Sequence, residues 1–93
     1  MPHIHRKFPG KSAKEIYQRV DEVMEDIAGE MSLDYRSDEA RRTGQVSKMG
    51  ITGAFAVKEG EVSVELKYPM LIPASLRKKV EDRIGEKLDG LFA

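Results

Sequence analysis

The 93-residue chain contains no cysteine and no tryptophan, and its formal net charge at pH 7 is zero. Without cysteine, a disulfide framework, a thiolate metal site and a thiol nucleophile are all excluded. The 16 basic and 16 acidic residues balance each other. This balance argues against a general nucleic-acid-binding protein, because affinity for polyanions depends on an excess of lysine and arginine. We therefore expect no nucleic-acid partner.

The sequence also lacks long apolar segments. Its apolar runs extend for only a few residues, whereas a membrane-spanning helix needs about 20, and the N-terminal residues show no apolar region typical of a signal peptide. We therefore expect a cytoplasmic protein without a transmembrane segment. Hydrophobic residues make up 40% of the chain, which suffices for one modest core, so residues 1–93 are expected to form a single domain.

The N-terminal part of the sequence predicts a short strand followed by a long amphipathic helix. Apolar and polar residues alternate over residues 3–8, as in a half-exposed strand, and Pro9-Gly10 ends the alternation. Ser12 and Glu15 form a capping box, in which each side chain binds a backbone N–H at the start of a helix. Apolar residues then recur every three or four positions, which predicts a helix over residues 12–31. This stripe comprises Ala13, Ile16, Tyr17, Val20, Met24, Ile27, Ala28 and Met31.

The remainder of the sequence predicts four more strands and a final helix. The strands are expected at residues 33–36, 42–48, 51–58 and 61–68, with a polar turn or loop at residues 37–42. The short turns Met49-Gly50 and Glu59-Gly60 separate the last three strands, and Pro73 is well placed to open the last helix. The apolar stripe of that helix comprises Leu76, Val80, Ile84, Leu88 and Leu91. If residues 33–48 formed one continuous strand, the sheet would have one strand fewer.

These elements predict an α+β protein with the order β-α-β-β-β-β-α. We expect a two-layer sandwich in which two helices cover one face of an antiparallel sheet of four to five strands. The two short turns fix the register of the last three strands: Val57 lies opposite Val62, and Val46 lies opposite Gly53. In this register every large apolar side chain falls on one face of the sheet.

The opposite face of the predicted sheet is small and polar. It carries no aromatic side chain on which a nucleic-acid base could stack, which again argues against RNA binding. The small residues on this face would let another flat surface approach: Ser47, Ala54, Ala56 and Ser63. The face therefore either forms a homodimer contact or is simply exposed to solvent.

Gly53 is a candidate pocket floor, because it faces the core between Val46 and Leu66 and leaves a dent where a side chain would be. The dent has two interpretations. Either a helix packs closely against the glycine, or the dent is the floor of a narrow apolar pocket for an acyl-like ligand between sheet and helices.

The apolar linker Met70-Leu71-Ile72 is a candidate interaction surface, because it lies beyond the last strand and before Pro73, at the edge of the core. Three consecutive apolar side chains at this place cannot easily all point inward. Either the linker exposes apolar surface for docking, or Leu71 and Ile72 plug the end of the core and only Met70 is exposed.

Several sequence segments together resemble a known family. The segment Gly50-Ile51-Thr52-Gly53-Ala54-Phe55-Ala56-Val57 resembles the signature G-[VI]-x-G-x-[IF]-x-V. It is followed by the alternating strand Val62-Ser63-Val64-Glu65-Leu66, by Leu71-Ile72-Pro73, and by a C-terminal helix ending in Leu88-Asp89-Gly90-Leu91. This order is similar to that of the small polyhydroxyalkanoic acid system proteins, the granule-region family. The resemblance implies a role near polyhydroxyalkanoate storage polyester, with some members placed at the granule surface, and it supplies no catalytic residue.

The sequence offers little chemistry for catalysis. It has no G-x-S-x-G nucleophile elbow and no phosphate-binding glycine-rich loop. His3 and His5 lie two residues apart and share a face of the first strand, but no third or fourth metal ligand accompanies them. We therefore expect no catalytic residue, no metal site and no cofactor.

The function that follows is a non-catalytic accessory protein that resembles polyhydroxyalkanoate system proteins. It would act by interaction with the granule, the polymer or a granule protein. The alternative is a small binding protein for an apolar, acyl-like ligand that uses a pocket between the sheet and the helices.

Overall fold

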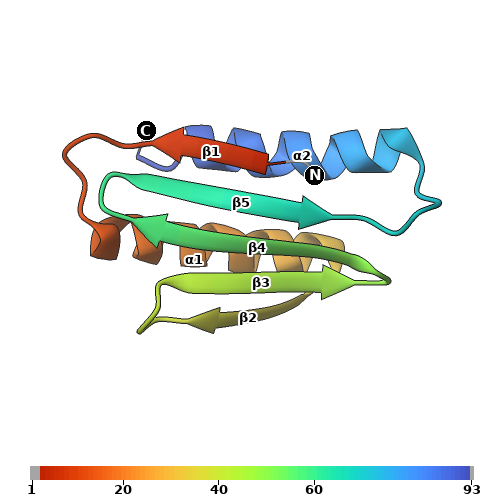
Figure 1. Ribbon diagram of the computed structural model, residues 1–93, viewed down its shortest axis with the longest axis horizontal. Coiled ribbons are helices and arrows are strands. Elements are labelled where there is room, and N and C mark those ends of the chain that lie inside the picture. The colour runs from red at the N-terminus through yellow and green to blue at the C-terminus, as the bar shows by residue number, and fades with distance from the viewer. Residues whose placement is uncertain (1–2, 93) are drawn as a thin grey trace.

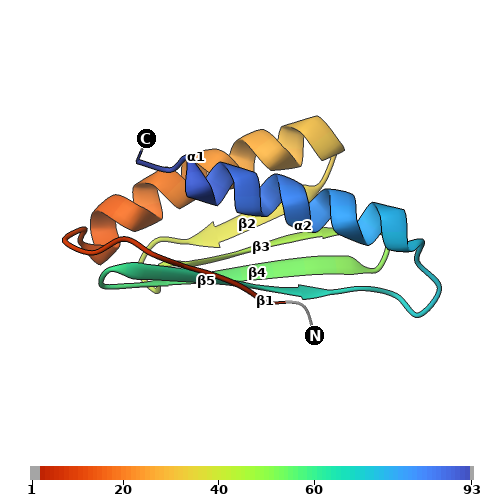
Figure 2. The same ribbon diagram turned by 90° about the horizontal axis from the view of Figure 1, so that it is seen from above.

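The computed structural model describes residues 3–92, which form a five-stranded antiparallel sheet with two helices on one face (Figures 1 and 2). The elements follow the order β1 (His3–Lys7), α1 (Ala13–Met31), β2 (Asp34–Asp38), β3 (Thr43–Lys48), β4 (Ile51–Lys58), β5 (Glu61–Lys67) and α2 (Ala74–Asp89). The predicted α+β class and element order are confirmed. Strands β2 and β3 are separate, so the sheet has five strands and not four.

The first helix begins where the capping box places it. The Oγ atom of Ser12 accepts a hydrogen bond from the backbone N–H of Glu15 at 3.2 Å, and the Glu15 carboxylate in turn accepts from the backbone N–H of Ser12. At the other helix, Pro73 is the residue just before α2 and not its first helical residue. Leu91 is buried although α2 ends at Asp89, so the predicted apolar stripe continues past the helix.

The register of the last three strands is confirmed. Val57 pairs with Val62 and Phe55 with Val64 on β5, while Val46 pairs with Gly53 on β4. Strand β5 ends at Lys67, one residue earlier than predicted, so its pairing with β4 begins at Thr52.

The predicted loop at 37–42 is too long. Ser37 and Asp38 belong to β2 and pair with Gly44 and Thr43. Both side chains are exposed, so no apolar alternation marks them, and the backbone hydrogen bonds to β3 alone make them part of the strand. Strand β2 lies at one edge of the sheet and β1 at the other, in the order β1-β5-β4-β3-β2.

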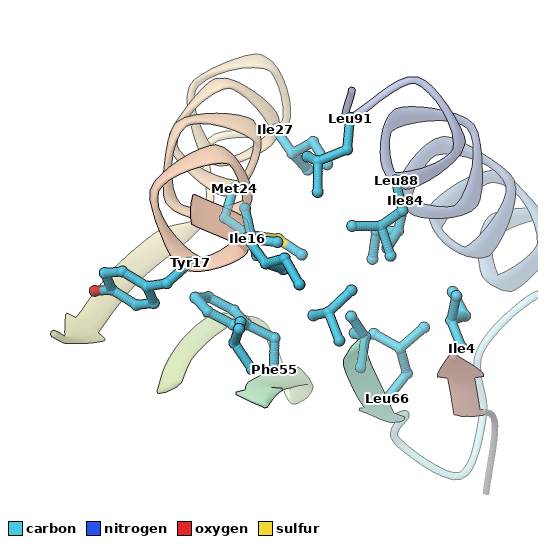
Figure 3. Packing of buried hydrophobic residues seen from close by; sticks show 14 of the residues in the cluster. Ile4, Ile16, Tyr17, Met24, Ile27, Phe55, Leu66, Ile84, Leu88 and Leu91 are labelled. Carbon is cyan, nitrogen blue, oxygen red and sulfur yellow. The ribbon is translucent and has the colours of Figure 1, made fainter. Parts of the chain in front are cut away.

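The hydrophobic core lies between the sheet and the helices (Figure 3). Helix α1 contributes Ile16, Tyr17, Val20, Met24 and Ile27; α2 and the residue beyond it contribute Val80, Ile84, Leu88 and Leu91; the sheet contributes Ile4, Phe55, Val57, Val62, Val64 and Leu66. The ring of Phe55 lies between two tyrosines, with centroids 6.1 Å from Tyr17 and 6.4 Å from Tyr35.

The two helices are not parallel. They separate toward the end of the molecule where α1 finishes and α2 begins, which is clearest in Figure 2. The turn between β3 and β4 and the linker between β5 and α2 lie at this same end (Figure 1). The splayed helices therefore leave this end of the core less completely covered.

Candidate functional site

Within residues 3–92, the exposed large hydrophobic side chains gather at one end of the molecule. They are Met49, Met70, Leu71 and Leu76, with exposed fractions of 87%, 96%, 93% and 37%. Together with Ile72 we call them the apolar end. They come from the β3–β4 turn, the β5–α2 linker and the first turn of α2. Large apolar side chains with such exposure, gathered at one end of a small protein, make this end a candidate interaction site.

The linker points outward. Leu71 is almost fully exposed, so the interpretation in which Leu71 plugs the end of the core is wrong. Ile72, the next residue, is half-buried. The reason is the path of the chain, which bows away from the sheet after β5 before Pro73 leads into α2 (Figure 2). Tyr68 holds the start of the linker to the helix, because its hydroxyl donates a hydrogen bond to Oε2 of Glu81 at 3.0 Å.

A pocket opens beside the apolar end, between the splayed helices and the sheet. Its volume is about 310 Å³, near the lower limit for small-molecule sites. The lining residues are Met24, Ile27, Met31, Leu33, Val46, Ser47, Lys48, Met49, Ile51, Gly53, Leu66, Pro69, Leu71, Ile72, Leu76, Val80 and Ile84. Among these described residues only Ser47 and Lys48 have polar side chains, so the pocket suits an apolar occupant.

Gly53 lines this pocket, but it leaves no dent above itself. A Cβ atom at Gly53 would lie 2.9 Å from Cδ2 of Leu66 and 3.1 Å from Cγ2 of Val46. The neighbouring side chains of the sheet therefore already occupy the space that the missing side chain leaves. The free volume comes instead from the divergence of the helices, which the sequence pattern does not reveal.

Lys48 is the single charged residue of the pocket lining. It lies at the end of β3, on the side of the sheet that faces the helices, and its Nζ donates a hydrogen bond to the carbonyl oxygen of Met31 at 3.2 Å. That carbonyl belongs to the last residue of α1, where unpaired C=O groups carry negative charge. Lys48 therefore stabilises the end of α1 and places a cation beside the apolar end.

The helix-free face of the sheet carries the four small residues of the predicted dimer contact. Ala54 is exposed, while Ser47, Ala56 and Ser63 are half-exposed. A shallow depression of about 480 Å³ crosses this face, and its lining also includes charged residues such as Arg36 and Glu65. A homodimer through this face stays a prediction, which sedimentation of the protein at several concentrations would test.

The described residues hold no cluster suited to metal binding. Within residues 3–92, no three histidine, aspartate or glutamate side chains gather to hold a metal ion. His5 lies beside Glu61, with Nε2 3.4 Å from Oε2. None of the buried side chains in this range is polar or charged, and no helix in it is both long and apolar enough to span a membrane.

Two tyrosine hydroxyls have strongly perturbed pKa values. Burial, together with a hydrogen bond to a carboxylate, raises the pKa of Tyr35 and of Tyr68 well above the ordinary value. The partner of Tyr35 is Asp21, with 2.5 Å between the hydroxyl and Oδ1. Each hydroxyl joins the sheet or the linker to a helix, so both tyrosines serve the structure and remain protonated near neutral pH.

These observations define a class: a small two-layer α+β protein with an apolar pocket and exposed apolar side chains at one end of the sandwich. The sequence profile of the family described as "Putative polyhydroxyalkanoic acid system protein" matches residues 3–92. The chain therefore belongs to this family of polyhydroxyalkanoic acid system proteins. No match was found among curated proteins or among solved structures.

Proposed function

We propose that the protein is a non-catalytic accessory protein of the polyhydroxyalkanoate system that docks on the storage granule through its apolar end. The observation that carries the proposal is the grouping of Met49, Met70, Leu71 and Leu76 at one end. Polyester is an apolar surface, and family membership supplies the connection to it. Under this proposal the protein resides in the cytoplasm and at the granule surface.

The energetics of docking favour the linker as the main contact. Full burial of a methionine or leucine side chain contributes about 1.5–3 kcal/mol, and Met70 and Leu71 are 96% and 93% exposed in the free protein. Both side chains therefore have nearly their whole area available to bury on a granule. Replacing them should weaken docking strongly and leave the core untouched.

The test is the double change Met70→Ser, Leu71→Ser, with Ala54→Ser, Ala56→Ser on the helix-free sheet face as the control. Co-sedimentation with isolated granules measures docking, and thermal melting measures stability. We expect the linker variant to keep its melting temperature but to be lost from the granules, while the control still sediments with them. A linker variant that sediments like the unmodified protein would overturn the proposal.

A second candidate function is the binding of a small apolar, acyl-like ligand. The pocket of about 310 Å³ favours it, because its lining is almost entirely apolar and it opens at the molecular surface. Ile51 lines the pocket and is only half-buried, so Ile51→Phe would fill part of the volume without removing a core side chain.

Displacement of a fluorescent fatty acid tests this second function. We expect the unmodified protein to bind the probe and Ile51→Phe to bind it much more weakly at unchanged melting temperature. The Ala54→Ser, Ala56→Ser variant again serves as the control, since Ala54 and Ala56 lie outside the pocket. Absence of probe binding to the unmodified protein, or equal binding by Ile51→Phe, would contradict a ligand in this pocket.

A further inference from the structure

Basic residues flank the apolar linker on both sides. The segment from residue 66 to residue 80 contains Lys67, Arg77, Lys78 and Lys79 and no acidic residue. Since the whole chain has a net charge of zero, this segment concentrates positive charge around Met70-Leu71-Ile72. The combination of exposed apolar side chains with basic neighbours is typical of proteins that bind at a lipid surface.

The basic residues of this segment are available to an external partner. Lys67, Arg77, Lys78 and Lys79 are all exposed, and within residues 3–92 none of them forms an ion pair. Lys48 adds a further exposed cation at the same end.

Two of the acidic residues near this end are engaged by other groups. Glu30 accepts a hydrogen bond from Arg83 at 2.6 Å, and Glu81 accepts one from Tyr68. Asp34 and Asp82 lie on the adjoining strand and helix. Over residues 66–82, four basic residues outnumber the acidic Glu81 and Asp82, so the linker and the start of α2 are net positive.

The start of α2 adds to this positive charge. The first turn of α2 contains no acidic residue, and no side chain caps its N–H groups. The positive end of the helix dipole therefore lies beside Ile72 without a compensating negative group.

We propose that the apolar end docks on a lipid surface that carries anionic headgroups, with Met70 and Leu71 inserted among the acyl chains and the flanking lysines and arginine at the headgroups. The proposal rests on the docking function above and names the chemistry of the surface. Lys78 and Lys79 lie only a turn beyond the start of α2, and one residue of helix advances by about 1.5 Å. Their long side chains can therefore extend along the helix toward the headgroup layer.

The shape of the site favours a lipid layer over a folded protein partner. Met70 and Leu71 are almost fully exposed in the linker between β5 and α2, and this linker bows outward (Figure 2). They can therefore enter a fluid layer without a matching groove. Each basic residue close to such a surface adds attraction to anionic lipid, and salt weakens this attraction.

The test is co-sedimentation of the full chain with two kinds of vesicle: phosphatidylcholine alone, and phosphatidylcholine mixed with phosphatidylglycerol. We expect tighter binding to the anionic vesicles and a loss of this preference at high salt. Lys78→Gln, Lys79→Gln should lower the partition coefficient on anionic vesicles roughly 30-fold. Lys7→Gln, Lys14→Gln removes two exposed lysines at the opposite end and should leave it unchanged.

The outcomes separate this inference from the docking function. Equal binding to both kinds of vesicle, or an equal loss in the Lys7→Gln, Lys14→Gln control, would overturn the anionic-surface proposal. Binding to bare polyester particles without binding to anionic vesicles would also overturn it, while docking on the granule would stand. If the protein bound neither vesicles nor polyester particles nor granules, both the granule-docking proposal and the anionic-surface proposal would be contradicted.

Discussion

The ring of Phe55 on β4 lies over Gly44 on β3, so closely that no side chain fits between them. A Cβ atom at residue 44 would lie 2.5 Å from Cζ of the ring, well inside the van der Waals distance. The two residues are direct cross-strand partners. The absence of a side chain at Gly44 therefore makes room for the ring of Phe55 in the core.

We expect Gly44→Ala to destabilise the protein, because Phe55 is buried and its ring must move to admit the methyl group. Overpacking of this kind costs about 1–3 kcal/mol. The control is Gly29→Ala in α1, because a Cβ atom at residue 29 would meet no atom within 4 Å. We expect this change to stabilise the helix by about 0.5–1 kcal/mol. Urea unfolding measures both changes, and a Gly44→Ala variant as stable as the unmodified protein would contradict the packing.

Phe55→Ala should be more costly still. The side chain of Phe55 is 3% exposed and packs between Tyr17 and Tyr35. Its removal should lower the free energy of unfolding by about 3–5 kcal/mol, as measured by chemical denaturation. A loss of less than about 1 kcal/mol would instead place Phe55 on the helix-free face of the sheet.

The sequence predicts the central sheet well and its edges less well. Two-residue turns at Met49-Gly50 and Glu59-Gly60 define the register of β3, β4 and β5 locally, because both partners lie close together in the chain. The pairing of β1 with β5 joins residues 3–7 to residues 61–65, and no local signal encodes this long-range contact. Ser37 and Asp38 are predicted to lie in a loop although they belong to β2. An exposed edge strand needs no alternation of apolar residues, so the sequence carries no local signal for it.

The candidate site, too, could be predicted only in part, because its geometry depends on contacts between distant parts of the chain. The apolar residues Met70, Leu71 and Ile72 stand out in the sequence, but only the path of the chain decides that Leu71 is exposed and Ile72 half-buried. The pocket depends on the angle between two helices, and neither helix encodes this angle by itself. Gly53 does line this pocket, but the missing side chain at Gly53 is not what creates the free volume.

Ser12→Ala should weaken the start of α1. The Ser12 hydroxyl accepts from the backbone N–H of Glu15, and without it this donor loses its partner within the protein. We expect a loss of about 1 kcal/mol in the free energy of unfolding. Thermal or urea unfolding provides the measurement, with Ser12→Asp as the control that restores an acceptor. An unchanged melting curve for Ser12→Ala would argue against the capping box.

Stability should fall at alkaline pH. Burial and carboxylate hydrogen bonds raise the pKa of Tyr35 and Tyr68 in the folded protein, so both stay protonated while the unfolded chain loses these protons above about pH 10. The unfolded state then binds fewer protons than the folded state, and the free energy of unfolding decreases as pH rises.

Urea unfolding at several pH values tests this expectation. The decrease above about pH 10 should be smaller in Tyr35→Phe and Tyr68→Phe, since each variant removes one of the titrating hydroxyls. If both variants follow the same alkaline decrease as the unmodified protein, other groups must cause it.

The two edges of the sheet bear on how the protein behaves at high local concentration. The edge strands β1 and β2 are the shortest of the sheet, with five residues each, and each carries charged side chains such as Lys7 and Asp38. Short, charged edges oppose strand-by-strand addition of further copies. A protein crowded on a surface can therefore expose apolar side chains at one end without growing into cross-β fibrils along its edges.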